Sequence, residues 1–305
     1  MRRQGDALAT TVECAEAIEE APPPRPEWKR VVRVFSRRKL AVAGLVIVVL
    51  MVLVAIFAPL LAPYDPYQTD ILTKLQPPSS EHWLGTDSVG RDTLSRVIYG
   101  TRISLLVAVC AVALGAFIGQ ILGLLAGYFG GWVYTVIMRL IDAMMAIPMI
   151  VLALVISAVL GGGVKNVIIA LAIGGIPGQC RMMCAQTLSV KQNDYVLAGR
   201  TIGVSNLRMM LRHIYPNAFA PCLVMMTIGM GATILAEAGL SFLGAGINPP
   251  TAAWGSMIDG GTRYLLRLPI LSIAPGIGIM LLVFGFNMMG DGLRDALDPR
   301  MRGTV

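Results

Sequence analysis

Charged side chains are scarce in this chain of 305 residues: Asp, Glu, Lys and Arg together make up only 14%, against 55% hydrophobic residues. The mean hydropathy is +0.69. A water-soluble domain of this length cannot bury so much apolar surface, because its own surface must be covered largely by polar groups. The composition excludes an ordinary soluble domain and predicts an integral membrane protein.

Residues that carry most enzyme chemistry are also few. The two histidines, His82 and His213, fall on opposite sides of the membrane in the predicted topology, which argues against a His-based metal site or a Ser-His-Asp triad. None of the five lysines is followed by Ser or Thr, so the sequence has no G-x-x-x-x-G-K-[ST] phosphate loop. We predict no catalytic residue, no metal site and no ATPase in this chain. We also predict no nucleic-acid partner, because the basic residues are unevenly placed.

The cysteines form no pattern that predicts disulfides. They are scattered, and three of the five stand in apolar stretches, where a cysteine acts as a small apolar side chain. Cys180 and Cys184 are four residues apart on one predicted helix, and a soft-metal site that they share with ligands from elsewhere is the alternative.

Six apolar stretches approach or exceed the roughly 20 residues that a helix needs to cross a bilayer. The third is expected to be extended at its start by the amphipathic segment Trp132–Asp142, in which Arg139 and Asp142 are expected to form a local ion pair. The fourth carries Pro177 and Arg181 in its second half. The predicted fold is all-α with spans at Leu40–Ala62, Ile103–Tyr128, Ala143–Leu160, Asn166–Leu188, Asn217–Leu243 and Ile270–Met289.

The basic residues predict the orientation. With a cytoplasmic N-terminus, 18 of the 25 Lys and Arg fall in cytoplasmic segments, as the positive-inside rule requires. Both termini are then cytoplasmic. Residues 1–39 form a tail whose basic segment Trp28–Lys39 either lies among lipid headgroups or only marks the start of the first span. Residues 40–302 form the transmembrane domain, with an outer loop at 63–102 and a cytoplasmic loop at 189–216.

A glycine recurs at every fourth residue of the second span. This spacing leaves one helix face smooth, so that another helix can approach closely. The pattern predicts tight helix packing and says nothing about a solute. The glycines are Gly115, Gly119, Gly123, Gly127 and Gly131.

Glu237 is the one charged residue within an unambiguously apolar span. An ionisable group at that depth costs about 2.5–3.5 kcal/mol unless it faces a partner or water. We expect it to face the interior of the bundle or a wet cavity. Two interpretations stay open: a gate or pathway residue, or a structural carboxylate bonded to a neighbouring helix.

The loop at residues 189–216 has an ordered, amphipathic pattern. Val196–Ile202 is expected to form a helix that Gly203 ends in the left-handed conformation. Ser205 is expected to cap a second helix, and Pro216 to begin the next span. Such a loop suits docking into a groove on another protein, and the alternative is a helix lying on the lipid. The second helix has an apolar face, Leu207, Met210, Leu211 and Ile214, and a basic face, Arg208 and Arg212.

This loop resembles the "EAA" loop of permeases in type I ATP-binding cassette (ABC) importers, and looks closest to the second permease of the dipeptide, oligopeptide and nickel group. Gly203 and Pro216 match the glycine and proline of the motif, and Ala198 matches its first alanine. Leu197 and Gly199 stand where the motif has Glu and its second alanine. The glutamate is commonly lost in this group.

Other stretches are similar to the same group in the same order. They are His82–Arg96 after the first span, Ala236–Gly244 around Glu237, Pro249–Gly255 before the last span, and Gly290–Arg300 near the C-terminus. The resemblance covers about residues 28–302.

The resemblance implies a transport subunit without enzyme activity in the bacterial inner membrane. Its implied partners are a homologous second permease, two ATPase subunits that hold ATP and Mg²⁺ and dock at Leu197–Tyr215, an extracytoplasmic substrate-binding protein, and the lipid bilayer. No cofactor is expected on this chain itself. The alternative is a stand-alone carrier or channel driven by an ion gradient.

The resemblance also assigns candidate roles. The outer segments Leu84–Arg102 and Gly246–Arg267 either receive substrate or serve as scaffold, and Arg294, Asp295 and Asp298 either brace the loop or ATPase or form a solvated tail. The candidate residues are Asp194, Ala198, Gly199, Gly203, Ser205, Arg208, Arg212 and Pro216 for ATPase coupling, Glu237 for the pathway, and Asp87, Arg91, Asp92 and Trp254 for the outer loop.

Overall fold

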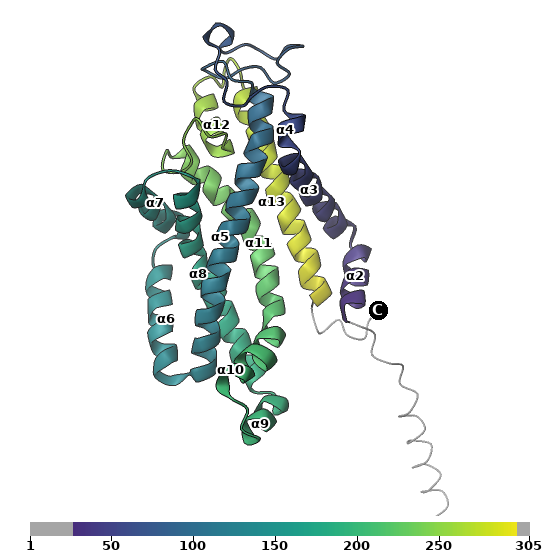
Figure 1. Cartoon of the computed structure of the whole chain (residues 1–305), viewed down its shortest axis with the longest axis vertical. Coiled ribbons are helices and arrows are strands. Elements are labelled where there is room, and N and C mark those ends of the chain that lie inside the picture. The colour runs from purple at the N-terminus through teal and green to yellow at the C-terminus, as the bar shows by residue number, and fades with distance from the viewer. Residues whose placement is uncertain (1–26, 298–305) are drawn as a thin grey trace, which may run out of the picture.

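The computed structural model describes residues 27–297 and shows a bundle of long helices with smaller elements at its two ends (Figure 1). Helices are the regular structure of the described residues, as predicted. Five helical stretches are long and apolar enough to span a membrane, and they confirm the predicted spans other than the third. They are α3 (Lys39–Ile56), α5 (Thr93–Phe129), α8 (Val164–Lys191), the stretch Asn206–Phe242, which ends in α11 (Tyr215–Phe242), and α13 (Ile270–Leu297).

The third predicted span differs from expectation. Instead of one extended helix, α6 (Gly131–Met145) and α7 (Met149–Leu160) meet at a bend of 87°. Pro148 stands in the bend, and a proline disfavours the helical conformation in the residue before it. The chain has six candidate crossings among its described residues only if this bent pair counts as one.

The predicted ion pair in α6 is also wrong. Asp142 does not bond Arg139; its Oδ1 lies 2.5 Å from an Nη2 of Arg181 on α8. A pair between two helices depends on how the helices pack, which the spacing along one helix does not reveal.

The glycine stripe is confirmed as the contact between α5 and α8. A Cβ placed on Gly115 would lie 2.6 Å from the carbonyl oxygen of Ala172, and one on Gly119 would lie 2.7 Å from that of Ile176. The two backbones therefore touch along the stripe. Gly131 does not belong to it, because this residue begins α6 with a φ of +49° and has no such neighbour.

The C-terminal helix α13 packs between α3 and α11 (Figure 1). Its last turns also meet α2 (Glu27–Arg37), and Asp295 forms an ion pair of 3.1 Å with Arg38. Asp295 thus bonds the segment before α3, and a role in bracing the loop or an ATPase stays a prediction. Asp298 lies outside the described residues.

Each end of the bundle carries short elements. One end, here called the cap, comprises residues 62–92 and 244–268, with the 3-10 helix η1 (Ile71–Thr73) and α12 (Trp254–Thr262), beside α4 (Ala58–Leu61). The opposite end carries the 189–216 loop, with α9 (Asp194–Thr201), α10 (Asn206–Arg208) and the π-helical η2 (Met209–Ile214).

Candidate functional site

The 189–216 loop has the predicted bend. Gly203 has a φ of +79°, which confirms the left-handed conformation that favours glycine. Ser205 occupies the N-cap position before α10, but its side chain makes no capping hydrogen bond. Its carbonyl oxygen instead accepts a hydrogen bond of 2.9 Å from the backbone N–H of Met209.

Pro216 does not begin a separate helix. The π-helical η2 joins α10 to α11, so helical structure runs from Asn206 to Phe242. Pro216 stands in the first turn of α11, where its missing N–H is tolerated after a change of helix type. π-helical turns are rare and frequently occur at functional sites.

The predicted apolar face of the second helix is split by the structure. Met210 and Ile214 are buried, together with Met209 and Val196, whereas Leu207 and Leu211 face outward. The loop thus has a packed inner side and an exposed apolar outer side. The exposed apolar residues are Tyr195 (46% exposed), Leu197 (51%), Ile202 (80%), Leu207 (63%) and Leu211 (57%).

The loop is fastened to the end of α5 at Tyr128. The ammonium of Lys191 donates to the Tyr128 carbonyl oxygen at 2.7 Å, and the Tyr128 hydroxyl donates to Asn206 Oδ1 at 2.7 Å. The Arg200 guanidinium lies 5.1 Å from the centre of the Tyr128 ring. These contacts hold the loop as a formed surface. Its candidate residues Asp194, Ala198, Arg208, Arg212 and Pro216 are exposed, as are Gly203 and Ser205, and Gly199 is half-buried.

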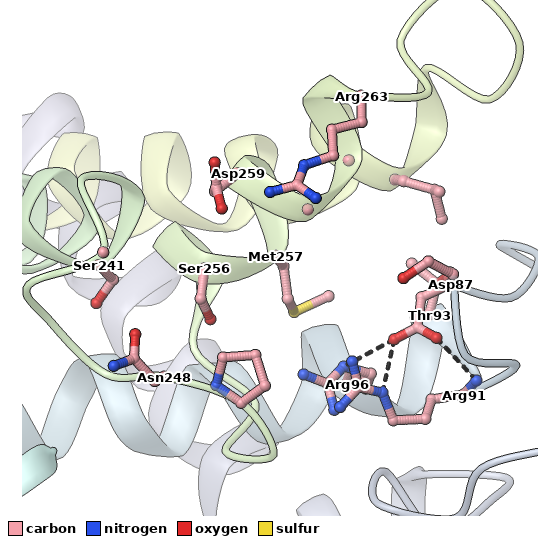
Figure 2. A pocket seen from close by; sticks show the side chains of 16 residues that line it. Asp87, Arg91, Thr93, Arg96, Ser241, Asn248, Ser256, Met257, Asp259 and Arg263 are labelled. Atoms are coloured by element: carbon pink, nitrogen blue, oxygen red, sulfur yellow. Dashed lines mark hydrogen bonds and ion pairs between the residues drawn. The ribbon is translucent and has the colours of Figure 1, made fainter. Parts of the chain in front are cut away.

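The cap is held by a charge cluster around Asp87 (Figure 2). An Asp87 carboxylate oxygen lies 2.7 Å from Arg91 Nε and 3.7 Å from Arg96 Nε. Arg96 also donates to the carbonyl oxygens of Pro66 at 3.0 Å and Pro250 at 3.2 Å, so it joins the two halves of the cap. Sequence reasoning missed Arg96, although the residue ends one of the family-like stretches.

A cavity of about 220 Å³ lies beside this cluster. Asp87 and Arg91 line it, and Asp259 and Arg263 lie across from them on α12 and at its end (Figure 2). Sequence reasoning singled out neither Asp259 nor Arg263, because a charge in a predicted loop gives no sign that it faces a cavity.

Asp92 and Trp254 do not line that cavity. Asp92 caps α5 by accepting from the N–H of Ser95 at 2.8 Å, and its other oxygen lies 2.9 Å from His82 Nδ1. Trp254 is fully buried and donates to the Val97 carbonyl oxygen at 3.0 Å. These contacts favour the interpretation of Asp92 and Trp254 as scaffold residues over a role in receiving substrate.

Glu237 is fully buried in α11. The hydroxyl of Ser241 donates to its Oε1 at 2.9 Å, and that of Ser104 on α5 donates to its Oε2 at 3.4 Å. The Ser241 oxygen in turn accepts from the N–H of Ile247 at 3.0 Å. These contacts favour the structural interpretation, and a gating role for Glu237 stays a prediction. Among residues 27–297, no cluster of three or more His, Cys, Asp or Glu is arranged to hold a metal ion.

Solved structures share this fold. A chain of the MetNI methionine ABC transporter, in inward facing conformations, superposes with a TM-score of 0.54 at 20% identity, covering 67% of this chain and 97% of that one. A chain of an amino acid ABC transporter with histidines gives 0.51 at 18% identity, covering 65% and 92%. At such identities the likeness shows the fold alone.

Comparison of sequences shows the family. The dipeptide transport system permease protein DppC of Alkalihalophilus pseudofirmus is 41% identical over 288 residues, covering 92% of this chain and 95% of that protein. The glutathione transport system permease protein GsiD is 41% identical in Pectobacterium atrosepticum (91% and 93% covered) and 44% identical in Escherichia coli O157:H7 (92% and 92%). Residues 27–78 match the N-terminal transmembrane domain of oligopeptide transport permease C.

Residues 119–303 match the binding-protein-dependent transport system inner membrane components, and the predicted resemblance is thereby confirmed. The chain belongs to this family, as a multi-pass permease subunit of an ABC importer in the bacterial inner membrane.

Proposed function

We propose that the solute of this importer is a short peptide and that this chain forms half of its pathway with a homologous second permease. The named dipeptide and glutathione permeases, each above 40% identity over nine-tenths of the chain, support this solute class. Glutathione is itself a tripeptide, so both names describe peptide-like solutes. In this proposal an extracytoplasmic binding protein delivers the peptide at the cap.

The 189–216 loop is proposed to be the docking site of two ATPase subunits, which hold ATP and Mg²⁺ and supply the energy. One observation carries this step: five exposed apolar side chains stand on a loop whose inner side is packed and fastened to α5. Exposed apolar groups on an ordered surface are typical of a protein interface. The distribution of Lys and Arg supports a cytoplasmic loop and cytoplasmic termini.

Negative charge introduced into the exposed apolar surface tests the docking site. The double variant Ile202→Glu/Leu207→Glu places two carboxylates in the proposed interface, where an unpaired buried charge is costly. Co-purification of the ATPase subunits with the chain should fall at least about tenfold, equivalent to about 1.4 kcal/mol or more. Gly203→Asp, which strains the bend at a φ of +79°, should weaken docking less.

Leu266→Glu is the matched control, because Leu266 is fully exposed at the opposite end of the bundle. This variant should retain the ATPase subunits at the wild-type level. If Ile202→Glu/Leu207→Glu retained the ATPase subunits at the wild-type level, the loop would not be part of the interface.

Reconstitution tests the energy source. Liposomes that hold both permeases, the two ATPase subunits and the binding protein should take up a labelled peptide only when ATP is present on the side of the membrane where the ATPase subunits dock. Liposomes with this chain alone and an ion gradient should take up none. Gradient-driven uptake by the chain alone would overturn the proposal in favour of a stand-alone carrier.

A further inference from the structure

A second cavity, of about 190 Å³, lies between α5, α7, α8 and α11. Its walls are mostly glycine, alanine and other apolar residues, with Met149 and Met225 among them. Methionine side chains are flexible and adapt to ligands of different shape. The walls from α5, α8 and α11 come from the interior of helices long and apolar enough to span a membrane, and Met149 begins α7, so the cavity lies at membrane depth.

Two polar side chains line this cavity, Gln179 of α8 and Thr233 of α11. Gln179 is 7% exposed and Thr233 is 5% exposed. The lining contains no charged residue. A buried amide beside a mostly apolar cavity is costly unless its polar atoms have partners, so the partners of Gln179 decide what the cavity can hold.

A chain of hydrogen bonds fixes the orientation of Gln179. The Tyr215 hydroxyl donates to Gln120 Oε1 at 3.0 Å. The amide nitrogen of Gln120 then donates to Gln179 Oε1 at 3.3 Å, and also lies 3.5 Å from Met226 Sδ. Because the Gln179 carbonyl oxygen is engaged as the acceptor, the free end of this amide is its NH₂ group.

The Gln179 NH₂ group makes no hydrogen bond to any part of residues 27–297. It is a donor without an acceptor, at the wall of a cavity, in a side chain that is more than nine-tenths buried. At membrane depth such a donor favours any solute that offers it an oxygen atom.

We propose that Gln179 is a solute-binding residue of the translocation pathway, whose side-chain NH₂ donates to a main-chain carbonyl oxygen of the passing peptide. Gln120 and Tyr215 are positioning residues that keep the NH₂ directed at the cavity. The inference rests on the proposed function, since it assumes a peptide solute, and it adds the group of the peptide that the chain recognises.

A main-chain carbonyl is the group that best fits these walls. A charged terminus or side chain finds no opposite charge in the lining, and a lone charge at this depth is costly. Every peptide carries main-chain carbonyls whatever its side chains, and glycine, alanine and methionine walls leave room for different side chains. The Thr233 hydroxyl adds a second polar group from α11.

The positioning chain also reaches the 189–216 loop. Tyr215 directly follows the π-helical η2 and precedes Pro216. The residue that starts the hydrogen-bond chain therefore belongs to the same helical stretch as the proposed docking surface.

The test compares a peptide with an analogue in which one peptide bond is replaced by a trans carbon–carbon double bond, which keeps the shape and the net charge but has no carbonyl oxygen. The complete transporter with its binding protein is reconstituted, and ATP-dependent uptake of labelled dialanine, trialanine and glutathione is measured first. For each peptide that the wild type takes up, the ratio of its uptake rate to that of its analogue is then determined. The same binding protein serves every variant, so changes in the ratio report the permease.

Gln179→Leu should lower this ratio about fivefold, as expected for one lost hydrogen bond. Tyr215→Phe should lower it about twofold, and Tyr215→Phe combined with Gln179→Leu should lower it no further than Gln179→Leu alone. Such non-additivity distinguishes a positioning residue from one that only stabilises the fold. Gln186→Leu is the matched control on the same helix and should keep the wild-type ratio, because Gln186 does not line the cavity.

A wild-type ratio in Gln179→Leu, with ATP hydrolysis still stimulated by the binding protein, would overturn the inference and leave the proposed function intact. If that variant does not assemble, Gln179→Met, which has a similar length but no NH₂ group, takes its place, and the same outcomes apply. A wild type that takes up none of the three peptides would overturn the proposed function and the inference with it.

Discussion

The cap and the 189–216 loop are held in place by different kinds of contact. In the cap, charged side chains meet inside the chain, as Arg96 does with Asp87 and with two backbone carbonyls. In the loop, the polar contacts gather at Tyr128 on the inner side, and five large apolar side chains stay exposed. The comparison teaches that charge pairs inside the chain fasten the cap, whereas contacts to Tyr128 fasten the loop. Both ends also keep large apolar side chains exposed, such as Leu72 and Leu266 in the cap.

The largest effect should come from the core of the cap. Trp254→Ala removes a fully buried ring between α5 and α13, next to Gly100 and Gly278. The free energy of unfolding should fall by about 3–5 kcal/mol, the usual cost for a buried aromatic ring. Thermal unfolding of the purified chain in detergent measures it. Trp132→Ala is the control, since Trp132 is 78% exposed, and a similar loss there would contradict the assignment.

A smaller loss should follow from the charge cluster. Arg96→Met keeps the apolar stem but leaves the carbonyls of Pro66 and Pro250 without their donor, and Asp87 then has Arg91 alone. Stability should fall by about 1.5–3 kcal/mol, as for a hydrogen-bonded buried charge. Arg102→Met, at an exposed arginine on the same helix, should change stability by less than about 0.5 kcal/mol. Equal effects from the two variants would show that the cluster does not hold the cap.

The smallest effect on stability should come from the exposed side of the loop. Ile202→Ala/Leu207→Ala should change the free energy of unfolding by less than about 0.5 kcal/mol per site, because both side chains already face outward. The same variant should still weaken the capture of ATPase subunits. A loss of stability close to that of Trp254→Ala would break the comparison, since the loop would then be part of the core.

Sequence patterns with a regular period predicted much of this fold. The apolar stretches located α3, α5, α8, α11 and α13, and the glycine spacing located the contact between α5 and α8. The family-like stretches led to the family. These signals are local, so each can be read without knowing which helices are neighbours.

What the sequence did not reveal depends on tertiary neighbours. Pro148 separates α6 from α7, while Pro177 lies inside an unbroken α8. Neighbouring helices can satisfy the backbone groups that a proline frees, so the residue alone does not decide the outcome. Likewise, the contact of Gln120 with Gln179 joins residues 59 positions apart, and sequence analysis gave no reason to pair them.

The glycine contact between α5 and α8 has a mechanical consequence. Two helices whose backbones touch along several turns behave as a single stiff rod, and α8 alone, with 28 residues, is about 42 Å long. The 189–216 loop is tied to one end of this rod through Lys191 and Tyr128, and the cap lies at the other. A tilt of the rod about the cap would therefore move the loop furthest and the wall that carries Gln179 about half as far, as a lever does.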